Sequence, residues 1–262
     1  MAKHALLVGV NRYANSQFNL RGCVNDVESL ARLLSTTYSF SGTGEIEFLK
    51  DSQATQTGIM GRLTAMLSAA RSGDTLVFAF SGHGTQIASK DPAEPDLKDE
   101  CLVPYEGSYG SLIKDGDLFA LFNQYVDQSI KFTAIYDCCH SGNHAASDGC
   151  RCGRPDRQEV INRCLPIEAV SDYFGRPFEI GPYNVLSACR DEQTAADVRE
   201  AGPEKMARGA FSYALHNMLT TGRDSPIVVA EAQIQAGIGA VTTHPQTPSF
   251  VMIDQNSPLI RY

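Results

Sequence analysis

The sequence predicts an α/β protein with a mostly parallel central β-sheet and helices on both faces. Two features of the chain point to this fold class. Continuous apolar runs, typical of strands that are buried on both sides, recur along the 262 residues. Amphipathic stretches with helical spacing separate most of these runs. Such an alternation indicates βαβ crossovers, in which functional residues lie beyond the carboxyl ends of the strands.

The N-terminal part of the chain begins this alternation. Residues 4–10 form an apolar run and predict a buried strand. Leucines at helical spacing predict a helix over residues 25–38, with Asn25 as its N-terminal cap. A short strand is expected at residues 45–49. A second helix is expected at residues 55–71, although two internal glycines weaken it.

The middle of the chain supplies the strands expected at the centre of the sheet. Residues 74–82, with the sequence DTLVFAFSG, and residues 130–137, with the sequence IKFTAIYD, are apolar almost throughout. Both runs therefore predict central parallel strands. A helix is expected between them at residues 116–126, and a further strand at residues 183–189.

The C-terminal part continues the pattern with two helices and one strand. The first helix covers residues 209–222, and Gly222 closes it. The second covers residues 227–241, whose middle is helical in its spacing, and the last strand covers residues 249–253.

The length of the chain suits one large domain, which we expect over residues 1–262. Its larger part covers about residues 1–142, and its smaller part covers about residues 183–262. Polar segments without clear periodicity interrupt the alternation at residues 86–117 and 143–182, and the second of these connects the two parts. Loops of this length inside a compact domain are usually functional or mobile.

The composition narrows the class of partner. A net charge of -8 argues against nucleic acid, because phosphate binding needs a basic surface. The same charge suits a cationic substrate or simply favours solubility. No apolar run approaches 18 residues, so no membrane segment is expected, and the N-terminus lacks a signal-peptide pattern. We therefore expect a cytoplasmic protein with eight reduced cysteines. The oligomeric state is left open, with a monomer as the default.

Reactive side chains follow the two central strands at the points where these strands end. His83 comes directly after the first strand, between two glycines, and Cys138, Cys139 and His140 come directly after the second. If the strands are neighbours, His83 and one of the cysteines face each other across one crevice. A thiol beside an imidazole is the arrangement of a cysteine nucleophile with its base. Either residue alone would more often be structural.

The motifs SGHGTQ and DCCHSG resemble the paired signatures of metacaspases and of their bacterial relatives, the orthocaspases. These proteins are cysteine peptidases of the caspase-like fold. The order also agrees, because a caspase histidine lies roughly 50 residues before its cysteine. Similarity continues through LRGCVNDVESLARLL, KDECLVPYE, LSACRDEQTAAD and GAFSYAL, and covers roughly residues 6–248. The resemblance implies a caspase-like fold and an endopeptidase that acts on proteins or peptides.

The resemblance also implies roles for individual residues. Cys139, directly before His-Ser-Gly, corresponds to the nucleophile, and His83 to the catalytic histidine. The backbone amides of Gly84 and Cys139 correspond to the oxyanion donors. Four positions match the pocket for the residue before the scissile bond: Cys23, Asp26, Ser81 and Asp137. Carboxylates in a narrow cleft favour a cation, so cleavage after Arg or Lys is expected. No third member of a catalytic triad is evident.

The resemblance suggests calcium as a possible metal, because many metacaspases need it. Asp99 and Asp115 match the spacing of calcium ligands in the family. The paired acids usual at the second site are separated here by Gly116, which leaves Asp117 as a displaced ligand, and Asp148 is an approximate fit to the last ligand. Solvated surface acids explain this loop equally well. The expectation is therefore that no cofactor is required and that calcium binding is possible.

The connection between the two parts predicts self-cleavage. Metacaspases resemble this chain in carrying a cleavable connection, and a peptidase that prefers arginine would find its own substrate there. The candidate sites are Arg151, Arg154, Arg157 and Arg163. A zinc site formed by cysteines of this segment is an alternative, but their spacing matches none of the usual structural patterns.

Two other classes of protein remain as alternatives to a peptidase. A caspase-like module can bind partners without catalysis, but such modules usually lose the histidine or the cysteine, and this chain keeps both. A redox protein that uses Cys138 and Cys139 is disfavoured, because adjacent cysteines form a strained disulfide and no Cys-x-x-Cys motif is present.

For Asp26, a purely structural explanation is that acids are favoured near a helix N-terminus.

Overall fold

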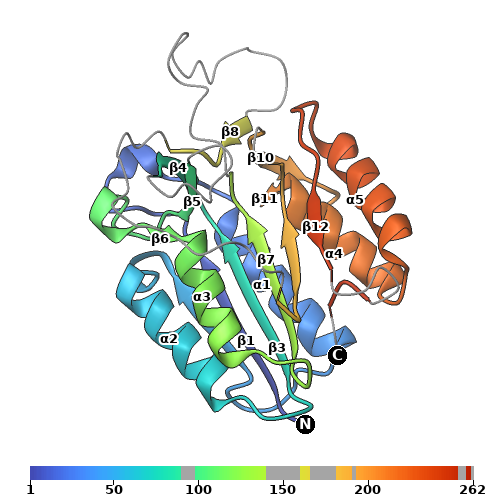
Figure 1. The fold of residues 1–262 in the computed structure, drawn as a ribbon. Coiled ribbons are helices and arrows are strands. Elements are labelled where there is room, and N and C mark those ends of the chain that lie inside the picture. The colour runs from blue at the N-terminus through green and yellow to red at the C-terminus, as the bar shows by residue number, and fades with distance from the viewer. Residues whose placement is uncertain (90–97, 140–159, 166–180, 191–192, 253–257, 261–262) are drawn as a thin grey trace.

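The computed structural model describes six ranges of the chain, which are 1–89, 98–139, 160–165, 181–190, 193–252 and 258–260. Within these ranges, the centre of the fold is a six-stranded sheet. Its strands are β1 Lys3–Gly9, β2 Ile46–Lys50, β3 Thr75–Ser81, β7 Lys131–Asp137, β9 Asn184–Ser187 and β12 Ser249–Val251. The spatial order is β12-β9-β7-β3-β1-β2 (Figure 1). Neighbouring strands run parallel except for β12, which runs antiparallel to β9. The predicted fold class is therefore confirmed.

Helices cover both faces of this sheet. The α-helices are α1 Cys23–Thr37, α2 Gln56–Ala69, α3 Asp115–Tyr125, α4 Ala210–Gly222 and α5 Ile227–Val241. Short 3-10 turns are η1 Ser16–Phe18, η2 Asp51–Gln53 and η3 Tyr109–Ser111. Helices α1 and α4 pack on one face, with α5 beside α4, and helices α2 and α3 pack on the other. Helix α1 begins at Cys23 with Gly22 as its cap, so the prediction that Asn25 is the cap was wrong.

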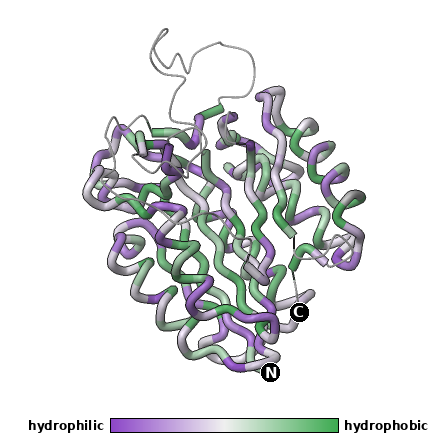
Figure 2. Tube along the Cα trace, in the orientation of Figure 1, coloured by the Kyte–Doolittle hydropathy of each residue, from purple (hydrophilic) through white to green (hydrophobic). Residues whose placement is uncertain are grey.

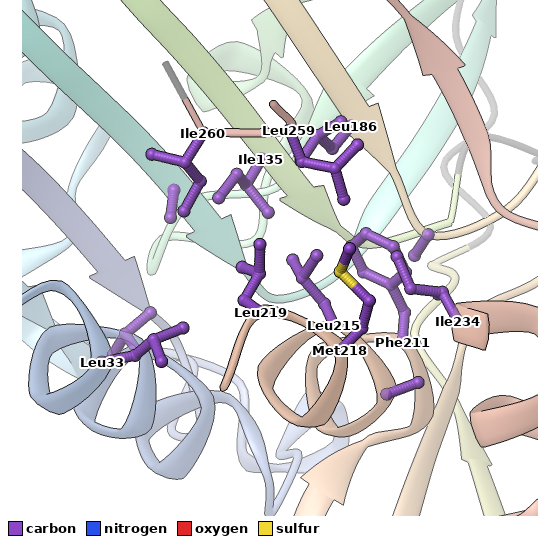
Figure 3. Packing of buried hydrophobic residues seen from close by; sticks show 14 of the residues in the cluster. Leu33, Ile135, Leu186, Phe211, Leu215, Met218, Leu219, Ile234, Leu259 and Ile260 are labelled. Atoms are coloured by element: carbon purple, nitrogen blue, oxygen red, sulfur yellow. The ribbon is translucent and has the colours of Figure 1, made fainter. Parts of the chain in front are cut away.

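The core divides into two hydrophobic clusters, one on each face of the sheet. Alternate residues of β1 show the division, because Leu7 joins the cluster under α1 and α4, whereas Leu6 and Val8 join the cluster under α2 and α3. Figure 2 shows the central strands as largely hydrophobic and the outer helices as mixed. In Figure 3, Leu219 of α4 and Ile135 of β7 lie in the first cluster. The strands are buried on both faces, as their continuous apolar runs indicated.

Two small sheets flank the carboxyl ends of the central strands. The first contains β4 Gly84–Ala88, β5 Lys98–Leu102 and β6 Ile113–Lys114. The second contains β8 Val160–Asn162, β10 Ala196–Ala201 and β11 Met206–Gly209. Sequence patterns did not predict these strands, because they are short and carry polar or charged residues at buried positions. The segments at 86–117 and 143–182 are thus not loops throughout.

Among the described residues, no helix combines the length and the hydrophobicity that crossing a bilayer requires.

Candidate active site

The central strands bring the two reactive segments to one edge of the sheet. Strands β3 and β7 are parallel neighbours, and Ser81 is paired with Asp137 at their carboxyl ends. His83 and Cys139 each follow their strand by two residues, at the same level of the sheet. Cys138 and Cys139 join opposite hydrophobic clusters, as expected for adjacent residues at the end of a strand.

The imidazole of His83 is buried and held by main-chain groups. Its Nε2 lies 2.8 Å from the carbonyl oxygen of Phe18. A carbonyl only accepts hydrogen bonds, so Nε2 carries the hydrogen and Nδ1 carries the lone pair. Among the described residues, Nδ1 is buried without a hydrogen-bond partner. The main-chain N–H of His83 donates to the hydroxyl of Tyr13 at 2.7 Å. The carbonyl of Phe18 is the orienting group that sequence patterns could not reveal.

Burial sets the protonation state of this imidazole. It lowers the pKa of His83 to about 4, although the main-chain oxygens of Phe18 and Arg163 favour the protonated form in part. His83 is therefore neutral at pH 7, with a lone pair on Nδ1 that can take up a proton.

The thiol of Cys139 is also buried, and it points to the smaller part of the protein. Its Sγ accepts a hydrogen bond from the main-chain N–H of Ala195 at 2.9 Å. Burial, together with the neighbouring thiols of Cys164 and Cys189, raises the pKa of Cys139. In the described part of the chain, no hydrogen bond joins this thiol to the imidazole of His83. The nucleophile candidate is thus a neutral thiol in the present arrangement.

A buried arginine fills the acidic pocket beside these residues. Arg163 follows β8 directly and is 0% exposed. Its Nη2 donates to Asp26 at 2.8 Å and to Asp197 at 2.9 Å. Its Nη1 donates to the hydroxyl of Ser81 at 2.7 Å and lies 3.2 Å from Oδ1 of Asp137. Arg163 belongs to the polar segment that connects the two parts of the chain, yet it is buried, because three carboxylates from distant parts of the chain surround its guanidinium group.

The main chain of Arg163 also makes hydrogen bonds to neighbouring segments. Its carbonyl oxygen accepts hydrogen bonds from the N–H groups of Gly84 at 2.9 Å and of Cys139 at 3.3 Å. Its own N–H donates to the carbonyl of Ala195 at 3.0 Å, and on the other side of the Arg163–Cys164 bond, Leu165 donates to the carbonyl of Gly84 at 3.0 Å. The amides of Gly84 and Cys139 thus converge on one peptide carbonyl.

The residues before Arg163 lie along β10 as an added strand. Strand β8 pairs antiparallel with β10, with Asn162 opposite Ala196 and Ile161 opposite Asp197. In Figure 1, β8 and β10 lie together above the carboxyl ends of the central strands. A chain bound in this way is held by main-chain hydrogen bonds and presents alternate side chains to the protein.

Two glycines leave the space that this arrangement needs. A Cβ atom at position 84 would lie 1.7 Å from the carbonyl oxygen of Cys139, so any other residue would push apart the loops that carry His83 and Cys139. A Cβ atom at position 209 would lie 2.1 Å from Oδ2 of Asp137 and 2.8 Å from Nη1 of Arg163. Glycine at 209 therefore keeps the pocket wide enough for a guanidinium group.

Other residues complete the wall of the pocket. Cys23, at the first turn of α1, is buried with its thiol beside Ser81, and burial raises its pKa. Nε of Arg208 donates to Oδ1 of Asp26 at 3.0 Å, while the N–H of Gly209 also donates to Asp26. Asp137 accepts from the main-chain N–H of Ser212 at 3.0 Å, and burial raises its pKa. Arg208 and Asp197 are pocket residues that the sequence analysis did not identify.

Several expected site residues lie elsewhere or outside the described part of the chain. Arg151, Arg154, Arg157 and Asp148 fall outside the described residues. Asp99 makes an ion pair with Lys114 at 3.4 Å, and Asp115 accepts from the N–H of Gly116 at the start of α3. Among the described residues, no group of three or more His, Cys, Asp or Glu side chains could hold a metal ion. The described acids thus do not fit a calcium site by themselves, and calcium binding stays a prediction.

The family description "Metacaspase, peptidase C14 domain" matches residues 3–147, which include both His83 and Cys139. The chain belongs to the metacaspase family. Metacaspase-1 of Schizosaccharomyces pombe is 30% identical over 83% of this chain and 60% of its own length. Metacaspase-2 of Trypanosoma brucei brucei is 28% identical over 74% of this chain and 56% of its own length.

Other similar proteins differ in sequence identity and in how much of this chain they cover. Metacaspase-8 of Arabidopsis thaliana is 38% identical over 54% of the chain, but over only 38% of its own length. The chain thus spans about 60% or less of the length of these relatives. A crystal structure of a Geobacter sulfurreducens protein covers 100% of this chain and 97% of its own with a TM-score of 0.68, at 18% identity. That likeness concerns the fold alone.

Proposed function

We propose that this metacaspase is a cysteine endopeptidase that cleaves after Arg or Lys, and that it cuts its own Arg163–Cys164 bond. One observation carries the proposal. The guanidinium of Arg163 lies in a pocket of carboxylates, while its carbonyl oxygen accepts hydrogen bonds from Gly84 and Cys139. A residue before a scissile bond needs both contacts, one for recognition and one to stabilise the oxyanion.

The chemistry uses the thiol of Cys139 and the lone pair of His83. Nδ1 of His83 takes the thiol proton as Sγ of Cys139 attacks the carbonyl carbon of Arg163 and forms a C–S bond. The oxygen gains negative charge where the two amides already donate to it, and loss of one such donor typically costs ~10²–10³ in rate. The imidazolium then protonates the nitrogen of Cys164 as the C–N bond breaks. Water hydrolyses the thioester, which restores the thiol and leaves Arg163 with a free carboxylate.

In the present arrangement the thiol of Cys139 is not hydrogen-bonded to its base. The thiol is protonated, hydrogen-bonded to Ala195 and without a hydrogen bond to His83. Rotation of the Cys139 side chain toward the imidazole is therefore part of the reaction, and it gives up the hydrogen bond from Ala195. The bond that would break is already held on both sides by main-chain contacts, so the substrate needs no comparable rearrangement.

The proposal is tested by the fragments that the protein forms. We expect intact-mass analysis of the purified wild type to find chains 1–163 and 164–262, and Cys139→Ala and His83→Ala to stay uncut at this bond. Arg163→Gln should remove this cut, whereas the control Arg62→Gln should keep it, because Arg62 is an exposed residue that pairs with Glu47. A Cys139→Ala protein that is still cut after Arg163 would refute self-cleavage.

Cleavage of other chains is tested with fluorogenic peptides that end in Arg, Lys or Asp, with and without calcium. We expect turnover of the Arg and Lys peptides, no turnover of the Asp peptide, and no turnover by Cys139→Ala. A calcium-dependent rate would support a site completed by residues such as Asp148. No turnover and no self-cleavage under any condition would favour the alternative, a module that binds partners without catalysis.

A further inference from the structure

Asp197 is the acid of the pocket that comes from the smaller part of the protein. It lies on β10, directly opposite the added strand β8, and its side chain is 1% exposed. Its Oδ1 accepts from Nη2 of Arg163 at 2.9 Å and from the N–H of Gly22 at 3.0 Å. Its Oδ2 accepts from the N–H of Arg21 at 2.9 Å. These two amides fix the carboxylate at the entrance to α1, so its position does not depend on the bound arginine.

Among the described residues, Asp137 and Asp197 are the pocket acids whose ion pairs are made with Arg163. Asp26 has a resident cation, because Arg208 donates to its Oδ1 at 3.0 Å. Among the described residues, the ion pair that Asp197 makes is with Arg163. A carboxylate that is buried beside main-chain amides alone gains much from a cation that completes its hydrogen bonds.

The geometry of the contacts favours a guanidinium over an ammonium group. Nη2 of Arg163 bridges Asp26 and Asp197, while Nη1 contacts Ser81 and Asp137. A guanidinium reaches both sides because its donors form a rigid planar fork. Lysine has one nitrogen, and its side chain ends about 1.3 Å short of the position of Nη2, at the level of the central guanidinium carbon. An ammonium group there lies farther from the contacts on both walls of the pocket than the two Nη atoms of arginine do.

We propose that Asp197 is a specificity-determining residue that makes this pocket select arginine over lysine. The inference rests on the proposed function, since it concerns the same pocket. Asp26 and Asp137 are the pair of carboxylates expected to recognise a cation. Asp197 is a third carboxylate, and we assign to it the preference for arginine over lysine. With lysine bound, Asp197 remains buried without a direct cationic partner, and this penalty falls on lysine substrates alone.

The test compares matched peptides that differ only in Arg or Lys before the scissile bond. We expect the wild type to show a kcat/KM for the Arg peptide that is ~10²-fold higher than for the Lys peptide, which is about the value of one charge-assisted hydrogen bond. Asp197→Asn should lower kcat/KM for the Arg peptide about 30-fold and for the Lys peptide less than about 3-fold. The preference would then fall about tenfold.

The matched control is Asp74→Asn. Asp74 is also buried and also accepts from two main-chain amides, those of Ala2 at 2.6 Å and Arg71 at 2.9 Å, but it lies at the opposite end of the strands. We expect it to leave the Arg-to-Lys ratio unchanged. If Asp197 acted only by anchoring α1, its replacement would lower kcat/KM for the Arg and Lys peptides by the same factor. The Arg-to-Lys ratio of kcat/KM would then stay unchanged, which distinguishes anchoring from recognition of the substrate.

A second variant keeps the test decisive if Asp197→Asn fails to fold, as judged by circular dichroism. Asp197→Glu retains the charge and extends it by one methylene toward a lysine ammonium, so it should raise the relative rate on the Lys peptide. A wild-type preference below about threefold, or an unchanged ratio in either folded variant, would overturn the inference alone. No turnover of either peptide by the wild type would overturn the proposed function and this inference together.

Discussion

The buried arginine allows a sharp test of the energetics of the uncut protein. The change is Arg163→Gln, made in the Cys139→Ala background so that no cleavage occurs. It removes a fully buried cation from contact with Asp26, Asp137 and Asp197. Breaking a buried ion pair by removing one partner typically costs ~3–5 kcal/mol, because the remaining charge stays buried without compensation.

If the segment stays docked, the expected loss of unfolding free energy is therefore at least ~3 kcal/mol. If the segment leaves the pocket instead, the carboxylates regain water and the loss equals the free energy with which the segment docks. For a chain of this size, 1 kcal/mol corresponds to roughly 2–4 °C, so we expect the melting temperature to fall by about 6–12 °C. The protein has no tryptophan, so urea and thermal unfolding are best followed by circular dichroism.

The control for this prediction is Arg62→Gln in the same background. Arg62 and Glu47 form an ion pair with side chains that are 62% and 45% exposed. Such surface pairs contribute ~0–1 kcal/mol, so the control should change the unfolding free energy by less than about 1 kcal/mol. Equal, small losses for Arg163→Gln and Arg62→Gln would refute the reasoning that the pocket carboxylates depend on this cation.

Three further predictions concern the pocket and the buried histidine. Gly209→Ala places a Cβ atom 2.1 Å from Oδ2 of Asp137, so kcat/KM for Arg peptides should fall at least ~10²-fold. A folded variant with near-normal kcat/KM would contradict this. The pKa of His83 is lowered to about 4, so the unfolded chain takes up a proton below pH 6.5 before the folded protein does. In the Cys139→Ala background, the unfolding free energy should thus fall by about 3 kcal/mol as the pH drops from 6.5 to 4, relative to the same protein with His83→Gln. Parallel pH profiles for the two proteins would exclude this linkage. Tyr13→Phe leaves the buried N–H of His83 without its acceptor and should cost ~1–3 kcal/mol in urea unfolding, whereas no measurable loss would show that another group replaces the hydroxyl.

The parts of the fold and site that local sequence patterns encode were predictable. Strands β3 and β7 are continuous apolar runs, and the chemistry follows them directly in the chain, so His83 and Cys139 could be placed at one edge of the sheet. Asp26 and Asp137 lie within motifs that resemble those of metacaspases, and both contact the buried guanidinium of Arg163. Both acids thus lie beside the guanidinium of Arg163, and their role in binding a substrate stays a prediction.

The missed features depend on contacts between distant residues. The orienting partner of His83 is a main-chain carbonyl of Phe18, which no residue type reveals. Asp197 lies in a short strand that carries two further charged residues, and its role appears only when β10 meets α1 and Arg163. An arginine in a polar segment is ordinarily exposed. Arg163 is buried because its three carboxylate partners come from three separate elements of the fold, which are α1, β7 and β10.

The pairing of β7 with β9 has a consequence for what a cut after Arg163 would do. These strands lie on opposite sides of the bond in the sequence, yet they are parallel neighbours, with Thr133 opposite Asn184 and Tyr136 opposite Ser187. Helix α4 also packs against α1 in one shared core. Covalent continuity at that point is thus not what holds the halves together. The nicked protein should migrate as a single particle on a sizing column and separate into two pieces only when denatured.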